Sequence, residues 1–282
     1  MSADWRIAAP RRVRLADYDP RATGGLSAEQ TQQELATLLP RLAELQDLLY
    51  GAGQQSVLIV LQGLDTSGKD GTIKHVMTAL NPLGCRVASF KAPTEDERSH
   101  DFLWRIHQQV PPRGILTIFN RSHYEDVLVA RVHQLAPTAV WRGRYHEINQ
   151  FERLLARNGT VVLKFFLHIS KGEQQKRLLA REDDPTKAWK LSTADWQDRA
   201  YWEAYQAAYE DALGRCGTTW APWEIVPADH KWYRNYVVAR RIVERLAKHE
   251  RLWRKELTAR GSAALAELAA YRAAGMPDDR PV

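Results

Sequence analysis

The feature that most constrains the fold is the stretch at residues 56–74, where a short apolar run leads into a glycine-rich loop. Val57 to Leu61 predicts a buried strand, Gly63 to Lys69 matches the Gly-x-x-x-x-Gly-Lys pattern of a Walker A loop, and the apolar face beginning at Ile73 predicts a helix. Glycines allow successive backbone N–H groups to point inward, and the helix N-terminus adds partial positive charge. The stretch therefore predicts a phosphate-binding loop, with a chance glycine turn as the weaker alternative. Its candidate phosphate-binding residues are Gly63, Thr66, Ser67, Gly68, Lys69, Asp70 and Gly71.

Two aspartates, Asp65 and Asp70, belong to this loop, and Asp70 occupies a position at which Walker A loops normally have a Ser or Thr. Asp70 follows Lys69, at the position where a Ser or Thr normally binds Mg²⁺. Asp65 and Asp70 would repel a bare phosphate, but a divalent cation could bridge them to phosphate oxygens. We predict Asp65 as a metal or substrate ligand. For Asp70 two interpretations stay open: a metal ligand, or a charge that stabilises the first turn of the helix.

Strand and helix patterns alternate along the rest of the chain, which favours a parallel sheet with helices on both faces. Ser27 and Gln30 predict a capping box for a helix that reaches about Tyr50, with a kink or split at Pro40. The other predicted strands are Arg86–Phe90, Ile115–Phe119, Thr160–Ile169 and Trp223–Val226. The other predicted helices run from Thr94 to about Gln109, from Tyr145 to Arg157 and from Tyr233 to Arg260.

A second polar cluster follows the predicted strand that ends at Phe119. Asn120 occupies the place where such folds position a metal-orienting group, and its amide oxygen can bind Mg²⁺ without charge. Arg121 beside a transferring phosphate would neutralise developing charge. Glu125 and Asp126 are further carboxylates for the site. The alternative, that these charges cap and salt-bridge the next helix, is weaker when the phosphate loop is considered with them.

Residues 171–215 are helical in pattern, rich in Trp and strongly charged, and they predict a helical lid. Asp183-Asp184-Pro185 interrupts the helix between two groups of cations, which suits a segment that closes over a polyanion. A solvated helix face is the alternative interpretation. The predicted lid cations are Lys171, Lys176, Arg177, Arg181, Lys187, Lys190 and Arg199.

Composition narrows the class of partner and the compartment. The net charge of +6 indicates an anionic partner, and the two cysteines, Cys85 and Cys216, provide no disulfide framework and no metal-binding spacing. Apolar runs stay well below membrane-spanning length, and the N-terminus has no apolar signal core. We therefore expect a cytoplasmic protein without a membrane partner. The alternation of basic and aromatic residues typical of nucleic-acid modules is missing, so we expect no nucleic-acid partner.

Several of these segments together resemble the family-2 polyphosphate kinases. The matching pieces are Gly63 to Gly71, Ser89 to Pro93, Ser99 to Arg105, Phe119 to Leu128, and Trp223 to Tyr233, within a span of about residues 27–250. The Asp after the loop lysine is a trait of that family, which accounts for Asp70. Asn-Arg-Ser-His-Tyr-Glu-Asp at residues 120–126 resembles the class III variety, whose members are associated with phosphorylating both AMP and ADP.

The resemblance implies a P-loop kinase-like fold with a helical lid, and a Mg²⁺-dependent transfer of phosphate from inorganic polyphosphate to AMP and ADP. Mn²⁺ could replace Mg²⁺, and guanine nucleotides stay open as acceptors. Lys69, Arg121, Arg177, Arg181, Lys187 and Lys190 would hold polyphosphate, whereas Lys91, Arg105, His123, Glu125 and Asp126 would face the nucleotide. Glu125, where other classes have Asn, is associated with accepting AMP. A homotetramer is common in the family.

We accordingly predict one domain over residues 1–282. It has an irregular arm at 1–26, a P-loop core at 27–170 and 216–260, the lid at 171–215 and a tail at 261–282. Asp65, Lys69, Arg121, Glu125 and Asp126 are the predicted catalytic residues, with Asp65, Asn120 and Asp70 as metal ligands. An ATP-dependent nucleotide kinase of the thymidylate-kinase type is the alternative enzyme. A nucleotide-switched or nucleic-acid-binding protein is the alternative outside enzymes.

Overall fold

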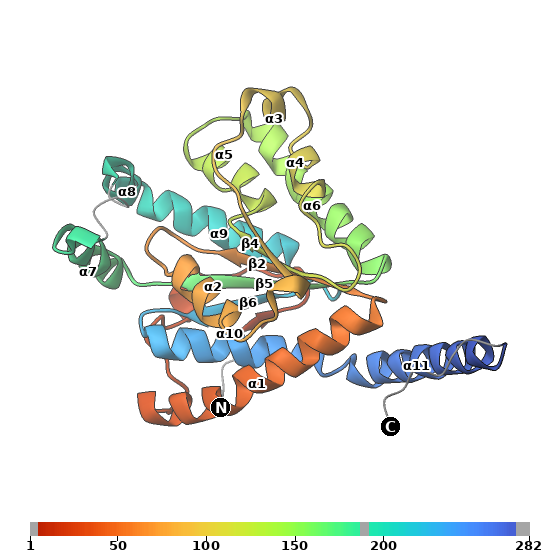
Figure 1. Cartoon of the computed structure of the whole chain (residues 1–282). Coiled ribbons are helices and arrows are strands. Elements are labelled where there is room, and N and C mark those ends of the chain that lie inside the picture. Colours follow the sequence, from red (N-terminus) through yellow and green to blue (C-terminus); the bar gives the residue numbers. More distant parts are fainter. Residues whose placement is uncertain (1–4, 187–191, 275–282) are drawn as a thin grey trace.

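The computed structural model describes residues 5–186 and 192–274, and a six-stranded sheet lies at its centre (Figure 1). The strands are β1 (Arg6–Ile7), β2 (Ser56–Gln62), β3 (Cys85–Ser89), β4 (Leu116–Asn120), β5 (Thr160–His168) and β6 (Trp223–Pro227). Their order is β1-β6-β5-β2-β4-β3, and all neighbours from β6 to β3 are parallel. At the edge, β1 pairs antiparallel with β6. The predicted parallel sheet is confirmed for five strands, and the short antiparallel edge strand is an addition.

Helices cover both faces of the sheet, and the side chains of β2 alternate between two apolar cores. Leu58 and Val60 belong to the core beneath α5 (Val129–Val132), α6 (Thr138–Arg157) and α9 (Trp202–Cys216). Val57 and Ile59 belong to the opposite core, with α1 (Ala28–Ala52), α2 (Lys69–Met77) and α10 (Lys231–Leu246). Figure 1 shows these two helical layers on either side of the sheet. The predicted three-layer α/β architecture is therefore confirmed.

The first long helix, α1, begins where the sequence predicts. The Ser27 side chain accepts a hydrogen bond from the Gln30 backbone N–H, and the Gln30 side chain accepts one from the Ser27 N–H. Of the kink or split predicted at Pro40, the split is wrong, because α1 is one helix of 25 residues with Pro40 inside it. Leu42, Leu45 and Leu49 beyond the proline are fully buried. Their burial against the sheet offsets the lost backbone hydrogen bond.

Two predicted helices are each divided in the structure. The helix expected from Thr94 to Gln109 is α3 (Glu95–Ser99) followed by α4 (Trp104–His107). Asp101 accepts a hydrogen bond from the Leu103 N–H at 2.9 Å, which starts the second helix anew. The helix expected from Tyr233 to Arg260 is α10 followed by α11 (Glu250–Ala273).

The final helix, α11, extends away from the body in Figure 1. Its fully buried residue Trp253 donates from Nε1 to the Gln55 side chain at 3.0 Å, and this contact fixes the base of the helix. The segment predicted as a tail from residue 261 is helical to Ala273. Over the described ranges, no helix combines the length and apolar character that crossing a bilayer requires.

The N-terminal arm, predicted as irregular, contains ordered elements that pack into the core. Besides β1 it contains the short helix η1 (Leu15–Asp17), and Ile7 and Leu15 are fully buried. Arg11 donates its backbone N–H to the Gly214 carbonyl of α9 at 3.1 Å. A Cβ at Gly214 would lie 2.4 Å from the Arg11 carbonyl oxygen, so the close approach requires glycine. The buried side chains of the arm therefore form part of the core.

Four of the remaining elements follow the edge of the sheet at which its parallel strands end: η3 (His123–Asp126), α7 (Lys171–Glu182), α8 (Thr193–Asp198) and η5 (Arg199–Tyr201). The short helix η2 (Pro82–Gly84) lies at the opposite edge, directly before β3. In Figure 1, α7 and α8 stand at one side of the body, opposite α11. The predicted lid also included residues of α9, but α9 packs into the sheet core through Ala208, Ala212 and Leu213.

Candidate active site

The phosphate loop joins β2 to α2, as the sequence predicts. Gly63 and Gly68 have φ values of 153° and 101°, which residues with a Cβ rarely adopt. A Cβ at Gly63 would lie 2.8 Å from the Leu167 carbonyl oxygen. The buried hydroxyls of Thr66, Ser67 and Thr72 have no hydrogen-bond partner. A phosphate at the N-terminus of α2 would offer acceptor oxygens to such groups.

Lys69 lies beneath the loop with 8% of its side chain exposed. Its Nζ donates to the carbonyl oxygens of Gly63 at 2.7 Å and Leu64 at 3.3 Å, and it lies 4.0 Å from an Asp65 oxygen. Burial, reinforced by the charge of Arg121, lowers the pKa of Lys69 to about 8, although Asp65 and Glu125 act in the opposite direction. Lys69 is thus a cation at neutral pH and close to losing its proton in mild alkali.

Arg121 connects the phosphate loop to the turn that follows β4. Because β2 and β4 are parallel and in register, with Leu61 opposite Asn120, their ends lie side by side. The guanidinium forms an ion pair with Asp65, and its Nη1 lies 3.1 Å from Glu125 Oε2. Burial acts to lower the pKa of Arg121, but the carboxylates of Glu125 and Asp65 outweigh it and raise the pKa. The arginine therefore stays charged between two carboxylates.

Asp126 belongs to a second charged group beside this one. It lies 3.8 Å from Arg105 and 3.5 Å from Arg144. Burial raises the pKa of Asp126 to about 6, even though Arg144 and Arg105 lower it. Arg105 also donates to the Lys91 carbonyl at 2.9 Å, while the Lys91 side chain is exposed. Of the five residues predicted to face the nucleotide, Arg105, Glu125 and Asp126 thus lie at η3, and Lys91 is joined to them through its backbone carbonyl.

His123, the fifth, does not point into this site. It is fully buried, and its Nε2 lies 3.2 Å from Glu152 Oε1. Burial lowers the pKa of His123, although Glu152 raises it. Arg121, just before η3, pairs with Asp65 of the phosphate loop and with Glu125 of η3, whereas His123 and Tyr124 of η3 are buried in the core.

Asn120 and Asp70 lie together at the mouth of the loop. Asn120 donates from Nδ2 to Asp70 Oδ1 at 3.0 Å, which leaves its buried Oδ1 without a partner. Glu125 Oε1 is likewise buried and unpaired. Among the described residues no three His, Cys, Asp or Glu side chains form a metal cluster. Mg²⁺ at phosphate sites uses one or two carboxylates together with waters and substrate phosphates, so these unpaired oxygens fit such an ion.

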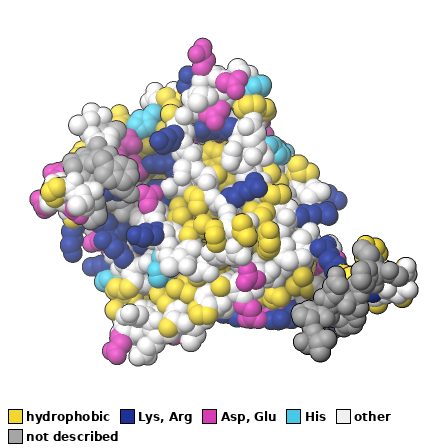
Figure 2. All heavy atoms as spheres, in the orientation of Figure 1, with side chains coloured by type: hydrophobic (Ala, Val, Ile, Leu, Met, Phe, Trp, Pro, Cys, Tyr) yellow, Lys and Arg dark blue, Asp and Glu magenta, His cyan; other side chains and the backbone are white. Residues whose placement is uncertain are grey.

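The predicted lid cations differ in their surroundings. Arg177 is buried, and its guanidinium donates to four backbone carbonyls, those of Thr66, Ser67, Ala228 and Asp229, at 2.6–3.1 Å. Arg181 of α7 pairs with Asp195 of α8 at 3.0 Å. Lys187 and Lys190 lie outside the described residues. Figure 2 shows Lys and Arg side chains gathered on the side where α7 lies.

Three aromatic residues of α9 form a side of the site that the sequence did not reveal. Trp202, Tyr205 and Tyr209 line a cavity of about 20 Å³ together with Asp65, Arg121 and Glu125. Their spacing of three and four residues along one helix was a signal that could have shown a shared face. Arg234 was also missed: this buried side chain donates to the Ser67 carbonyl at 3.3 Å.

A strand, a glycine loop, a buried lysine and a helix N-terminus, with an arginine on the adjacent strand end, define the class of P-loop phosphotransferases. Within that class, the model of the family described as "Polyphosphate kinase 2 (PPK2)" matches residues 25–253. The chain therefore belongs to the polyphosphate kinase 2 family, which confirms the resemblance seen in the sequence.

Named relatives and a solved structure agree with this assignment. The chain is 51% identical over 244 residues to an AMP/ADP-polyphosphate phosphotransferase of Meiothermus ruber, covering 86% of this chain and 91% of the relative. It is 45% identical to an ADP-polyphosphate phosphotransferase of Rhodopseudomonas palustris, covering 77% and 80%. A crystal structure of polyphosphate kinase 2 from Arthrobacter aurescens TC1 superposes with a TM-score of 0.83 at 44% identity, covering 86% and 88%.

Proposed function

We propose that the protein transfers the terminal phosphoryl group of inorganic polyphosphate to AMP and ADP, forming ADP and ATP. An acceptor phosphate oxygen forms a bond to the terminal phosphorus. The bond from that phosphorus to the bridging oxygen breaks, and its electron pair stays on the shortened chain. The observation that carries the proposal is the position of Arg121, whose guanidinium contacts Asp65 on the phosphate-loop side and Glu125 on the opposite side.

The donor phosphates bind at the phosphate loop in this proposal. Lys69 supplies a buried positive charge, and the unpaired hydroxyls of Thr66 and Ser67 supply hydrogen bonds. Arg177 donates hydrogen bonds to the backbone carbonyls of Thr66 and Ser67. It therefore affects polyphosphate binding by keeping the loop in its conformation. Arg181, on the outer part of α7, contributes charge along the donor chain. Phosphoryl transfer demands mainly positioning and charge stabilisation, and these groups supply the protein's share of both.

The acceptor nucleotide binds on the η3 side, where Glu125, Asp126, Arg105 and Lys91 meet. The Arg121–Glu125 pair orients the acceptor phosphate toward the loop. Use of both AMP and ADP, the class III behaviour, is supported by Glu125 and by the name of the Meiothermus relative. Guanine nucleotides stay open as acceptors.

Mg²⁺ is the proposed cofactor, with Mn²⁺ as a substitute. Asp65 together with the unpaired oxygens of Asn120 and Glu125 would hold it, and Asp70 orients Asn120 through their hydrogen bond. When bound, the ion neutralises charge on the phosphate oxygens. Asp65 also forms an ion pair with Arg121, so the metal ion and the guanidinium would both neutralise the negative charge of this carboxylate.

The direct test is incubation of the purified protein with AMP or ADP, Mg²⁺ and long-chain polyphosphate, with nucleotides separated by chromatography. We expect ADP and ATP to form, and chelation of the metal to stop the reaction. No product under these conditions would sink the proposal. Product formed from ATP but not from polyphosphate would favour the alternative, an ATP-dependent kinase of the thymidylate-kinase type.

We further propose that the protein works in the cytoplasm as an oligomer, a homotetramer by resemblance to its family. Buried free thiols at Cys85 and Cys216 suit a reducing compartment. Exposed apolar side chains along α11, among them Leu265, Leu268 and Tyr271, offer a surface for association. Light scattering coupled to size exclusion would give the mass of the assembly, and a monomer at micromolar concentration would count against this part.

A further inference from the structure

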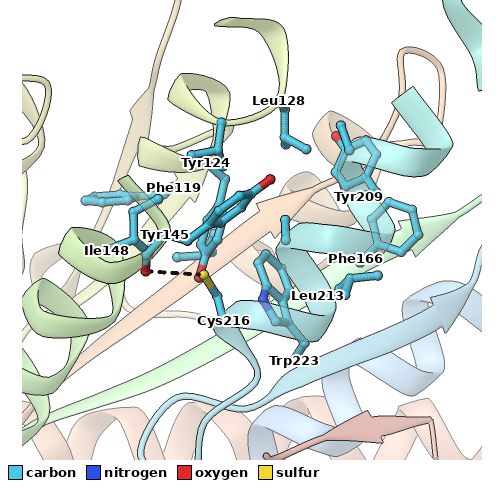
Figure 3. Packing of buried hydrophobic residues seen from close by; sticks show 14 of the residues in the cluster. Phe119, Tyr124, Leu128, Tyr145, Ile148, Phe166, Tyr209, Leu213, Cys216 and Trp223 are labelled. Carbon is cyan, nitrogen blue, oxygen red and sulfur yellow. Dashed lines mark hydrogen bonds between the residues drawn. The ribbon is translucent and has the colours of Figure 1, made fainter. Parts of the chain in front are cut away.

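A group of charged and polar side chains lies entirely inside the core behind η3, on the side away from the phosphate loop. Lys164, in the middle of β5, has no exposed surface. Its Nζ donates to Glu152 Oε2 at 2.6 Å, to the Tyr124 hydroxyl at 2.8 Å and to the Cys216 carbonyl at 2.7 Å. Figure 3 shows Tyr124 and Cys216 close together in this core, next to Trp223. One ammonium group thus connects three separate elements.

The same buried polar group also anchors the turn at residues 121–125, which carries Arg121 and Glu125. Tyr124 donates its hydroxyl to Glu152 Oε1 at 2.8 Å, and the His123 ring lies 3.2 Å from that oxygen. Both residues stand between Arg121 and Glu125 in the sequence. His123 and Tyr124 are anchored in the core, and this anchoring determines the positions of the flanking side chains, Arg121 and Glu125.

A second polar connection reaches the same turn through β2. Gln62 donates from Nε2 to the Ser122 hydroxyl at 3.0 Å, and Tyr209 of α9 donates to Gln62 Oε1 at 3.4 Å. Gln62 and Ser122 are fully buried. Together with the Lys164 bond to the Cys216 carbonyl, this joins α9 to η3 at two points. Both joints are polar and directional, so they fix an orientation as well as a contact.

The turn needs such anchoring because its backbone is strained. Arg121 has a φ of 62°, in the left-handed region that residues other than glycine seldom adopt. Such a conformation persists only where the surroundings enforce it. A buried ion pair contributes little to stability compared with apolar residues of the same volume. Stability alone therefore gives a weak reason for placing Lys164 and Glu152 in an otherwise apolar core.

We propose that Lys164 and Glu152 are positioning residues for phosphoryl transfer, which hold η3 and α9 so that Arg121 and Glu125 meet the phosphate loop. This inference rests on the proposed function. Neither residue touches the substrates, so loss of the pair should lower kcat while the KM for polyphosphate changes little. A displacement of about 1 Å in a positioned group can cost up to about a hundredfold in rate.

The main test is the double variant Lys164→Met with Glu152→Leu. Replacing both partners by apolar residues of similar volume avoids an unpaired buried charge, so the chain should still fold. At a temperature well below its melting point we expect kcat for ADP to fall by about 10- to 100-fold. The readout is the split between the two constants: kcat falls while the KM for polyphosphate stays near its wild-type value.

A second variant with a smaller structural change keeps the test decisive if the double variant does not fold. Tyr124→Phe removes the hydroxyl that links Lys164 and Glu152 to the turn but keeps the ion pair itself. We expect about a tenfold fall in kcat with little change in the KM for polyphosphate. The matched control is Thr160→Val, which breaks the buried 3.0 Å contact with Ser56 at the opposite end of β5 and should leave kcat unchanged.

The outcomes separate the two levels of the proposal. Wild-type kcat in a folded double variant, or in Tyr124→Phe should the double variant not fold, would overturn the positioning role. A lower melting temperature with unchanged kcat, as expected for the control Thr160→Val, would also overturn the positioning role. Absence of transfer by the unmodified protein would instead refute the proposed function.

Discussion

Helices α7 and α9 both face the phosphate loop, yet they are attached to the body in different ways. α9 buries eight residues, Trp202, Tyr205, Ala208, Tyr209, Ala212, Leu213, Gly214 and Cys216. α7 buries three, Gln174, Arg177 and Leu178, and two of these are polar. Its firmest contacts are the hydrogen bonds from Arg177 to backbone carbonyls. Apolar burial fixes α9, whereas hydrogen bonds attach α7.

This difference divides the site into two halves. The fixed half comprises the phosphate loop, Arg121 and α9, and the attached half comprises α7 and α8. Each hydrogen bond from the charged Arg177 contributes about 1.5–3 kcal/mol, as much as one fully buried Leu. The two halves therefore differ in the kind of attachment: opening of α7 breaks a few directional bonds, whereas opening of α9 exposes eight buried residues.

The largest expected effect tests the fixed half directly. Arg121→Met should lower kcat by about 10³-fold or more, since an arginine that stabilises the charge of a transferring phosphoryl group contributes 10³–10⁵. Steady-state rates with ADP and polyphosphate measure this. Arg121→Lys is the matched control and should recover a small part of the rate, because it restores charge without the two-sided contact to Asp65 and Glu125. A loss below tenfold in Arg121→Met would remove the arginine from the mechanism.

A stability comparison sharpens the contrast between the helices. Leu213→Ala, at a fully buried position of α9, should cost about 2–5 kcal/mol in urea unfolding. Leu179→Ala in α7, where the side chain is 45% exposed, should change stability by less than about 0.5 kcal/mol. Equal losses would show that the two helices are attached alike.

Substitutions in the attached half should raise the KM for the donor, polyphosphate, more than the KM for the acceptor, ADP. Arg177→Met removes hydrogen bonds from a charged group to the loop carbonyls, each worth about 1.5–3 kcal/mol, so we expect the KM for polyphosphate to rise about 10- to 100-fold. The KM for ADP should change much less. Lys176→Met, at the exposed neighbouring position, is the control. Equal changes in both KM values would place Arg177 outside donor binding.

The smallest expected effect is a pH dependence in the fixed half. Because the pKa of Lys69 is about 8, its charge and the rate should fall about tenfold between pH 7 and pH 9. Lys69→Arg stays charged and should lack this limb, whatever its absolute rate. The stability effect has the opposite sign: between pH 8 and 10.5 the unfolded chain binds more protons at this residue, so its contribution to stability rises with pH. A flat rate profile from pH 7 to 9 would contradict the assignment.

The phosphate loop and the parallel strands could be predicted because their signals are local. An apolar run followed by glycines and a lysine specifies strand, turn and helix within twenty residues. The same holds for the capping boxes at Ser27 and Thr94, both present in the structure. Helix ends without such signals were missed. The break between α10 and α11 has neither Gly nor Pro, and the burial of Trp253 against Gln55 accompanies it.

The buried polar group behind η3 could not be predicted, because its partners are distant in sequence. Lys164 lies in a strand that the sequence predicts as apolar, and a single Lys there does not reveal whether it faces Glu152 or water. The resemblance likewise places His123 at the nucleotide, whereas the structure pairs it with Glu152 in the core. Contacts between residues 28 to 40 positions apart decide which side chains of η3 are buried.

The position of α11 has a practical consequence for the use of this protein on surfaces. The helix leaves the body on the side opposite α7, and its 24 residues span about 36 Å (Figure 1). A chain immobilised through the far end of α11 would hold its phosphate loop away from the support. Long anionic donor chains could then approach without contact with the matrix, and the helix would serve as a built-in spacer arm.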